Sequence, residues 1–478
     1  MSEVIFEKKS RNPGEHVSPT DPLFKLSAAI PEKHLRRSPL GIPELSELEV
    51  VRHFTRLSQK NFCVDTNFYP LGSCTMKYNP RVNDQVAAWP FYARIHPYQE
   101  ERHVQGMLQV IHELEEDLCR ITGMDAFSLQ PAAGAQGEFA GLLIVKAYHD
   151  LKGQKRTKVF VPDSAHGTNP ASAALCGYEV VQIKTDAAGR VDVADLKTKA
   201  KKDTACFMMT NPNTLGLFEN NIREITRIVH DAGGLVYYDG ANLNALLGIS
   251  RPGDMDFDIV HVNLHKTFAV PHGSGGPGSG PVGVRAELEK FLPQPRLKRT
   301  EEGFVWDYDR PYSIGRLRSF YGNVGAYLRS YCYIRALGSA GLKRVSEFAV
   351  LAANYLKARL KNHYEMPHDS HCMHEFVCSA RAQKAKGVKA LDIAKRLLDE
   401  GIHAPTVYFP LIVEEALMVE PTETESKQTL DEFADAMIRI AEQADRDPAS
   451  VQAAPVSTPV GRIDEVKAAR TPNLRWQD

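Results

Sequence analysis

Short apolar segments alternate with amphipathic ones between residues 127 and 264, and this alternation restricts the possible folds more than any other feature of the chain. The apolar segments have the length of strands, and most are followed by residues with helical spacing. The expected strands cover residues 127–129, 158–161, 178–183, 205–209, 235–238 and 259–264. Because strands that alternate with helices build βαβ units, the sequence predicts an α/β fold with a mostly parallel sheet covered on both faces.

The regions on either side of this alternating core have a different pattern. Residues 1–100 are rich in Pro, Asn and aromatic residues, so we expect an irregular arm that wraps a larger body. Residues 101–325 are expected to form that body as one large domain. A helix from Val324 to Leu337 then leads into a smaller C-terminal α+β domain over residues 326–478, with a tail after Arg446 that is expected to be extended.

Charge and hydropathy exclude two classes of binding protein. The chain has 58 Lys and Arg against 59 Asp and Glu, whereas proteins that bind nucleic acid or anionic membranes need a basic surplus. No run approaches the roughly 18 apolar residues of a membrane helix, and no signal peptide is recognisable. The eight cysteines have no repeated spacing, which favours reduced thiols. We therefore expect a cytoplasmic protein.

One glycine-rich segment satisfies a nucleotide-binding pattern without its context. Gly273 to Gly278 fits G-x-G-x-x-G, which binds dinucleotides only where it follows a strand and opens a helix. Pro271 precedes the segment, and Pro277 and Pro281 fall where the helix would have to continue. We therefore expect a tight backbone turn here and no dinucleotide-binding fold.

A second group of residues is rich in metal-ligand types. Its members are His368, His371, Cys372, His374 and Cys378. Their spacing matches no standard zinc pattern. If residues 375–379 form a strand, alternate side chains also point to opposite faces and cannot converge on one ion. No metal is expected.

Two polar residues follow strands that we expect to be neighbours. Asp239 ends the strand at residues 235–238, and Lys266 follows the strand at residues 259–264. In open parallel sheets, ligands bind beyond the carboxyl ends of the strands. A carboxylate and an amine at this edge fit pyridoxal 5'-phosphate, because the lysine can form a Schiff base and the aspartate can pair with the protonated pyridine nitrogen.

Two further features suit the same cofactor. The turn at Ala132 to Gln136 opens a helix, and the N–H groups at a helix N-terminus can bind a phosphate. His166 follows the strand at residues 158–161, so its imidazole can stack on the pyridine ring. A single Lys, Asp or His at a strand end is usually structural. The occurrence of all four features in order favours a pyridoxal-phosphate enzyme.

Several longer segments resemble one family of such enzymes. They are Gly72-Ser73-Cys74-Thr75-Met76-Lys77, His166-Gly167-Thr168-Asn169-Pro170, Tyr238-Asp239-Gly240-Ala241-Asn242, Asn263-Leu264-His265-Lys266-Thr267-Phe268, Pro271 to Gly278, and Glu420-Pro421-Thr422-Glu423. Together they resemble the P-protein family of the glycine cleavage system, or glycine decarboxylase, from about residue 60 to the tail. The resemblance implies pyridoxal-phosphate fold type I, as in aspartate aminotransferase, with a large sheet domain and a small C-terminal domain.

The resemblance also implies partners and an activity. P-protein occurs as one long chain or as two subunits, and this lysine-bearing chain is similar to the second, catalytic subunit of the two-chain form. The expected partners are the first subunit, in an α2β2 heterotetramer, and lipoylated H-protein. The implied reaction is glycine decarboxylation with transfer of the aminomethyl group to the lipoyl arm, which is glycine dehydrogenase activity of EC class 1.4.4.

The resemblance assigns roles to individual residues. It implies that Lys266 forms the Schiff base, Asp239 pairs with the pyridine nitrogen and His166 stacks on the ring. Residues expected around the phosphate are Ala133, Gly134, Ala135 and His265, and residues placed near the cofactor are Thr168 and Asn242. Residues expected near the substrate or the lipoyl arm are Ser73, Thr75 and Lys77.

Other functions on the same fold stay open at this point. An aminotransferase, an aldolase or a cysteine desulfurase would also use a Schiff-base lysine, and a desulfurase would need a mobile catalytic cysteine, for which Cys74 is the residue to examine. A non-catalytic interaction subunit should lack the lysine, which this chain has in context.

Overall fold

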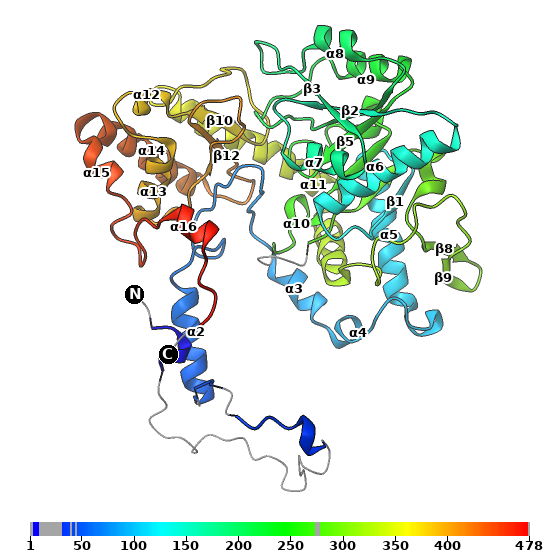
Figure 1. The fold of residues 1–478 in the computed structure, drawn as a ribbon, viewed down its shortest axis with the longest axis horizontal. Helices are drawn as coiled ribbons and strands as arrows, with labels where there is room; N and C mark the ends of the chain where they lie inside the picture. The colour runs from blue at the N-terminus through cyan, green and yellow to red at the C-terminus, as the bar shows by residue number, and fades with distance from the viewer. Residues whose placement is uncertain (1–2, 9–30, 39–40, 44, 273–277, 477–478) are drawn as a thin grey trace.

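A seven-stranded sheet forms the centre of the larger part of the molecule (Figure 1). The computed structural model describes residues 3–8, 31–38, 41–43, 45–272 and 278–476. The strand order is β1-β7-β6-β5-β4-β2-β3, and β7 is antiparallel to both of its neighbours while the other pairs are parallel. The bounds are β1 Ala126–Ser128, β2 Lys158–Pro162, β3 Glu179–Ile183, β4 Thr204–Met209, β5 Leu235–Gly240, β6 Ile259–Val262 and β7 Val282–Val284. The predicted parallel α/β sheet is confirmed.

Helices cover both faces of this sheet, because alternate residues of its strands enter two separate apolar clusters. Tyr238 packs into one cluster, and its neighbour Tyr237 packs into the other. The helices of this part are α5 Gln105–Thr122, α6 Gly134–Leu151, α7 Thr168–Leu175, α8 Val193–Lys199, α9 Ile222–Asp231 and α10 Leu264–Thr267. The last of these corrects one strand boundary. The chain leaves β6 at Val262 and turns into α10, so Lys266 lies in a single helical turn.

A smaller sheet with its own core lies toward the C-terminus (Figure 1). Its antiparallel strands are ordered β10-β12-β11, with bounds Phe376–Ser379, Ala416–Val419 and Thr406–Val407. The helices packed with it include α12 Arg381–Lys384, α13 Ala390–Asp399, α14 Lys427–Arg446 and α15 Pro448–Gln452. A further two-stranded sheet in the larger part pairs β8 Arg296–Thr300 with β9 Gly303–Asp307.

The long helix α11, Val324–Leu360, links the two parts. The helix predicted over residues 324–337 ends where Gly338 leaves helical geometry, with φ 60° and ψ −176°. A second helical segment follows at once and carries Leu356 and Leu360 into the core of the smaller part. A glycine at this position adopts the positive φ at little steric cost.

The N-terminal arm is more regular than its composition predicts. It contains α2 Glu47–Ser58, α3 Arg81–Ala87 and α4 Pro90–Ala93. Ser46 and Glu49 form a capping box at the start of α2. The arm then crosses the small sheet, where Leu71 forms an antiparallel bridge with Val419. At the next position Gly72 lies so close to the strand that an added Cβ would fall 2.2 Å from Met418 Cγ.

The tail also differs from the extended chain that we expected, since α15 and a further short helix, α16 Glu465–Arg470, form after Arg446. The division into domains at residues 100 and 325 stays a prediction. None of the helices in the described ranges combines the length and the apolar character needed to cross a membrane.

Candidate active site

A cavity opens beyond the carboxyl ends of β4, β5 and β6, and residues from the arm and from the segment before β10 close its other side. This position follows from the topology, since parallel strands end at one edge of the sheet. The predicted site residues that line the cavity are Ser73, Gly134, Ala135, His166, Thr168, Asp239, Asn242 and Lys266. The structure therefore brings together most of the residues that the sequence indicated.

The remaining predicted residues lie just outside this wall. Ala133 precedes α6 as its N-cap. His265 accepts a hydrogen bond at Nδ1 from the Ser279 amide at 3.2 Å. Thr75 and Lys77 are buried behind the wall, in polar contacts that are described below.

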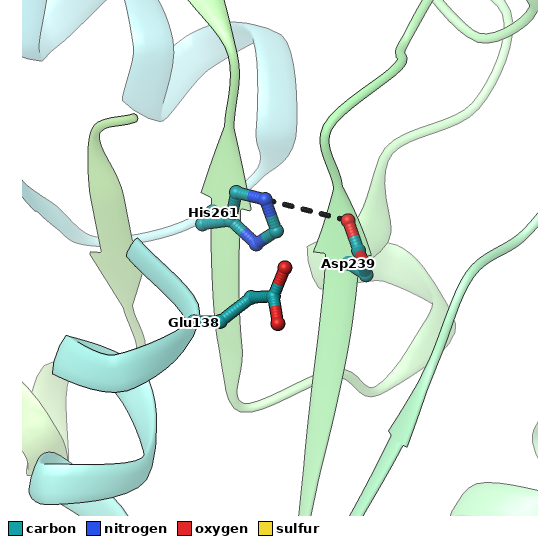
Figure 2. A group of neighbouring side chains, drawn as sticks. All are labelled: Glu138, Asp239 and His261. Atoms are coloured by element: carbon teal, nitrogen blue, oxygen red, sulfur yellow. Dashed lines mark ion pairs between the residues drawn. The ribbon is translucent and has the colours of Figure 1, made fainter. Parts of the chain in front are cut away.

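Three buried polar side chains of the cavity wall lie close together, as Figure 2 shows. Asp239 comes from β5, His261 from β6 and Glu138 from α6. His261 Nε2 lies 3.3 Å from Asp239 Oδ1, and Asn169 Nδ2 donates to Asp239 Oδ2 at 2.9 Å. Burial raises the pKa of Asp239, but His261, Asn169 and the Ala241 amide outweigh it and hold that pKa below the ordinary value. This carboxylate is therefore ionised.

Glu138 was missed by the sequence reasoning. It is 3% exposed, and burial together with the neighbouring Asp239 raises its pKa to about 7. Its two oxygens accept hydrogen bonds from Thr168 Oγ1 at 2.8 Å and from Ser172 Oγ at 3.1 Å. Thr168 Oγ1 in turn lies 2.9 Å from His166 Nδ1. Glu138 thus fixes the position of the Thr168 hydroxyl, which is hydrogen-bonded to His166 Nδ1. The available signal was a carboxylate in the first part of α6, because residues 134–145 contain no other charged side chain.

The N-terminus of α6 faces the same cavity through Gly134 and Ala135. The first amides of a helix have no acceptor within the helix, so they can bind an anion. Space there is restricted, because a Cβ added to Gly134 would lie 2.8 Å from the Asn263 side chain. These residues fit a phosphate group approached by backbone N–H donors.

Lys266 is half-buried, and no hydrogen bond or ion pair to its Nζ is present within the described part of the chain. It shares the cavity with Asp239 and with His166, whose pKa is lowered by partial burial of the ring and by Lys266. An amine, an ionised aspartate and a neutral imidazole around one cavity, with a helix N-terminus beside them, fit the aldehyde, pyridine nitrogen, ring face and phosphate of pyridoxal 5'-phosphate.

Two carboxylates of the smaller part hold the arm against the cavity. Glu375 accepts a hydrogen bond from the Ser73 amide at 2.8 Å, and Glu420 accepts one from the Thr75 amide at 3.1 Å. Ser73 and Thr75 both adopt positive φ angles, 65° and 54°. Such angles are unfavourable for residues other than glycine. The two hydrogen bonds help to stabilise this backbone, so both acids determine the shape of the cavity wall.

Lys77 forms a buried ion pair behind this wall. Its ammonium lies 2.6 Å from Glu423 Oε1 and also donates to Asn244 Oδ1 at 2.9 Å and to the Thr267 carbonyl at 3.0 Å. The side chains of Lys77 and Glu423 are only 1% and 8% exposed. The ammonium is therefore fully occupied by protein groups, which tie the arm to α10 and to the segment before α14.

We expect Lys77→Met to lower the free energy of unfolding by about 3–5 kcal/mol, because Glu423 would be left as an uncompensated buried charge. Thermal or denaturant unfolding measures the effect, and the double variant Lys77→Met/Glu423→Leu should recover part of the loss. Lys427→Met is the matched control, since Lys427 and Asp431 form an ion pair of 2.6 Å with the lysine 74% exposed. If both lysine variants lose the same stability, the buried pair does not hold the arm.

The metal-ligand residues near residue 370 do not gather into one site. In the described part of the chain, His374 lies with Glu375 and Glu420, whose ligand atoms are all within 4.8 Å of one another, and not with the cysteines. Cys378 is buried in β10. Residues 273–277 of the glycine-rich segment lie outside the described residues, so the predicted turn is not tested.

The family model "Glycine cleavage system P-protein" matches residues 20–298, and "Glycine dehydrogenase, C-terminal domain" matches residues 345–456. Two curated relatives, from Caldanaerobacter subterraneus and Halalkalibacterium halodurans, are 58% and 57% identical to this chain. The match to the first relative covers 94% of this chain and 93% of the relative. The match to the second covers 99% of this chain and 98% of the relative. Both relatives are named probable glycine dehydrogenase (decarboxylating) subunit 2.

Solved structures agree on the fold. An inhibitor-bound glycine decarboxylase (P-protein) of the glycine cleavage system is similar with a TM-score of 0.73 at 21% identity, covering 87% of this chain and 94% of that one. A sphingosine-1-phosphate lyase from Burkholderia pseudomallei has a TM-score of 0.66 at 14% identity, covering 90% and 97%. The predicted pyridoxal-phosphate fold type I is confirmed. From the family match over most of its length and the identity to both relatives, this chain belongs to the glycine cleavage system P-protein family, as a relative of its subunit 2 proteins.

Proposed function

We propose that this chain is the lysine-bearing subunit of a pyridoxal-phosphate-dependent glycine decarboxylase of EC class 1.4.4. In the proposed reaction the carbon–carbon bond of glycine breaks and the carboxylate leaves as CO2. The electron pair left on the aminomethyl carbon then forms a bond to one sulfur of the lipoyl disulfide of H-protein. The sulfur–sulfur bond breaks, and the other sulfur takes up a proton, so that the disulfide is reduced. The observation that carries the proposal is the placement of Lys266, Asp239 and His166 around one cavity in a chain of this family.

The residues that would hold the cofactor follow from the cavity. Lys266 Nζ would bind its aldehyde carbon, and Asp239 would accept a hydrogen bond from its pyridine nitrogen. The amides of Gly134 and Ala135 would bind its phosphate. Ala133 and His265, just outside the wall, would support that end. When bound, pyridoxal 5'-phosphate supplies an electron sink for the pair released as a carboxylate leaves.

The protein's own groups favour this chemistry in three ways. An ionised Asp239, kept so by His261 and Asn169, favours a proton on the nitrogen that faces it. His166, held through Thr168 and Glu138, would fix the plane of the ring. Lys266 Nζ is an amine without a competing partner among the described residues, so it can carry a proton to or from substrate.

The rival activities have no specific support. Cysteine desulfurases are among the similar structures, one with a TM-score of 0.61, but at 15% identity this likeness concerns the fold alone. A desulfurase needs a reactive thiolate, whereas burial raises the pKa of Cys74 despite the neighbouring Lys266. Ser73 lines the cavity and stays a candidate for substrate contact, while Thr75 and Lys77 would act through the arm.

The proposed partners are a first subunit, in an α2β2 assembly, and lipoylated H-protein. The relatives' designation as subunit 2 supports the first of these. So does α2, where Leu48, Val51, Phe54 and Leu57 are each about half exposed. An apolar helix face of this kind is typical of an interaction surface. The cytoplasmic location stays a prediction.

Phe54→Glu should therefore weaken association with the first subunit about tenfold or more, because it places a charge on the apolar face of α2. Sedimentation of mixtures of the two purified subunits measures the association. Arg56→Gln, on the same exposed helix, is the control that should leave association unchanged. Equal association of Phe54→Glu and the unchanged protein would remove α2 from the interface.

The test of the proposed function follows both products of one reaction. The chain, the first subunit and lipoylated H-protein are incubated with glycine labelled in its carboxyl carbon. We expect labelled CO2, together with H-protein whose mass has increased by one aminomethyl group. An aminotransferase would instead transfer the amino group of glycine to an added 2-oxo acid. The label would then stay in the 2-oxo acid that is formed from glycine. Label retained in glycine and unmodified H-protein would contradict the proposal.

A further inference from the structure

Two buried residues on the cavity wall are not among those that we assign to the cofactor. His374 and Glu375 precede β10 and line the same cavity as Lys266. They lie on the side of the cavity opposite the sheet. They are 3% and 4% exposed. Neither ring nitrogen of His374 has a hydrogen-bond partner within the described part of the chain. Because buried polar atoms are normally satisfied, an unpartnered imidazole facing a cavity points to a ligand.

Glu375 is one of two buried carboxylates that lie close together. Its Oε2 accepts from the Ser73 amide, and the ligand atoms of His374, Glu375 and Glu420 all lie within 4.8 Å of one another. Two carboxylates at this distance away from water cannot both be ionised. Burial raises the pKa of Glu420 as well, but its hydrogen bonds from Thr75 Oγ1 and Asn242 Nδ2, both at 2.8 Å, oppose this effect and favour its ionised form.

The proton of this pair therefore resides on Glu375. Burial and the neighbouring Glu420 raise the pKa of Glu375 to about 8. Since Oε2 is occupied by the Ser73 amide, Oε1 is the oxygen available to carry the proton as a donor. His374 is neutral as well, because burial and the two lysines Lys266 and Lys77 lower its pKa to about 3. Its ring supplies one N–H donor.

Resting on the proposed function, we infer that His374 and Glu375 bind the carboxylate of the amino acid substrate, each through one hydrogen. Glycine has only two polar groups, and Lys266 marks the place of its amine. Two other polar side chains on the wall already donate within the protein, Asn242 to Glu420 and Thr214 to the Ser164 carbonyl. No arginine is among the described residues that line the cavity.

Neutral donors suit a carboxylate that leaves. A bidentate arginine pair stabilises the charged carboxylate strongly, and this stabilisation is lost as the group becomes neutral CO2. Hydrogen bonds from an imidazole and a carboxylic acid orient the same group with less stabilisation of its charge. The subsite thus positions the carboxylate while resisting its departure less than an arginine would.

The inference is tested by binding, with the assembled complex loaded with cofactor. Glycine and methylamine, which carries an amine but no carboxylate, are titrated separately while the cofactor absorbance is recorded. His374→Phe should raise the Kd of glycine about tenfold or more and leave the Kd of methylamine within about twofold. Glu375→Leu also removes the acceptor of the Ser73 amide, so it should raise both Kd values, but that of glycine more than that of methylamine. Glu375→Gln, which retains an acceptor for Ser73 and an N–H donor, should bind glycine nearly as the unchanged protein does.

Cys372→Ala is the matched control, since Cys372 is 2% exposed, precedes His374 by two positions and does not line the cavity. It should change neither Kd. Unchanged glycine binding in His374→Phe would overturn the inference, and so would equal weakening of glycine and methylamine, which indicates a structural role. Failure of the unchanged complex to bind glycine while it binds methylamine would instead contradict the proposed function.

Discussion

Lys266→Ala should lower the rate of glycine decarboxylation by at least about 10³-fold, because it removes both the covalent attachment of the cofactor and an amine able to carry a proton. The visible absorbance of a lysine-bound cofactor should disappear with it. Lys266 is the only lysine among the described residues that line the cavity, so no neighbour is placed to replace it. We regard this as the largest effect of any single substitution.

The measurement combines an absorbance spectrum with reduction by borohydride and mass spectrometry of the digested protein. The unchanged protein should carry the reduced cofactor on the peptide that contains Lys266. Lys290→Ala, at an exposed lysine that lies over the rings of Phe291 and Tyr312, should retain both the spectrum and the activity. Reducible, covalently bound cofactor in Lys266→Ala would show that another lysine is used.

Asp239→Asn should lower activity by about 10²-fold or more while the cofactor stays covalently bound. The amide has the shape of the carboxylate but not its charge, so the pyridine nitrogen would lose the anion that favours its proton. His261 Nε2 would also lose the carboxylate oxygen that lies 3.3 Å away. Single-turnover rates measure the loss, and the absorbance spectrum verifies that the cofactor is still bound.

Asp258→Asn is a stringent control for this prediction. Asp258 is equally buried, at 5% exposed, and it lies at the opposite end of the same two strands. There it accepts from the Val236 amide at 2.6 Å and lies 2.7 Å from His230 Nε2. Its replacement should lower stability but leave the decarboxylation rate per folded molecule unchanged. Equal loss of activity in both variants would mean that Asp239 acts through the fold and not through the cofactor.

Much of the fold could be predicted because its signals are local. The strands at residues 205–209 and 235–238 are apolar runs that end at polar residues, and burial of both faces explains this pattern. The arm could not be predicted in the same way. In its helix α2, the apolar side chains of Val51 and Phe54 are exposed to solvent. Their pattern therefore does not indicate a buried core.

The residues of the candidate site also differ in whether a local sequence signal marks them. Asp239 and Lys266 stand next to strand ends and were found from their positions. Glu138, His374 and Glu375 lack such a signal, because their importance depends on contacts between distant segments, such as the hydrogen bond that joins Glu375 to Ser73. Glu420 lay in a segment that matched the family, but its role became visible only through its contacts with Thr75 and Asn242.

We propose that this chain, with its partner subunit, makes and breaks the bond between the carboxyl and methylene carbons of glycine. Exchange of labelled bicarbonate into the carboxyl group of unlabelled glycine tests it most directly, since the label enters only if that bond is reversibly broken. With the first subunit, lipoylated H-protein and pyridoxal 5'-phosphate present, we predict labelled glycine, and none when Lys266→Ala replaces the chain. The absence of exchange from the fully assembled complex would contradict the claim.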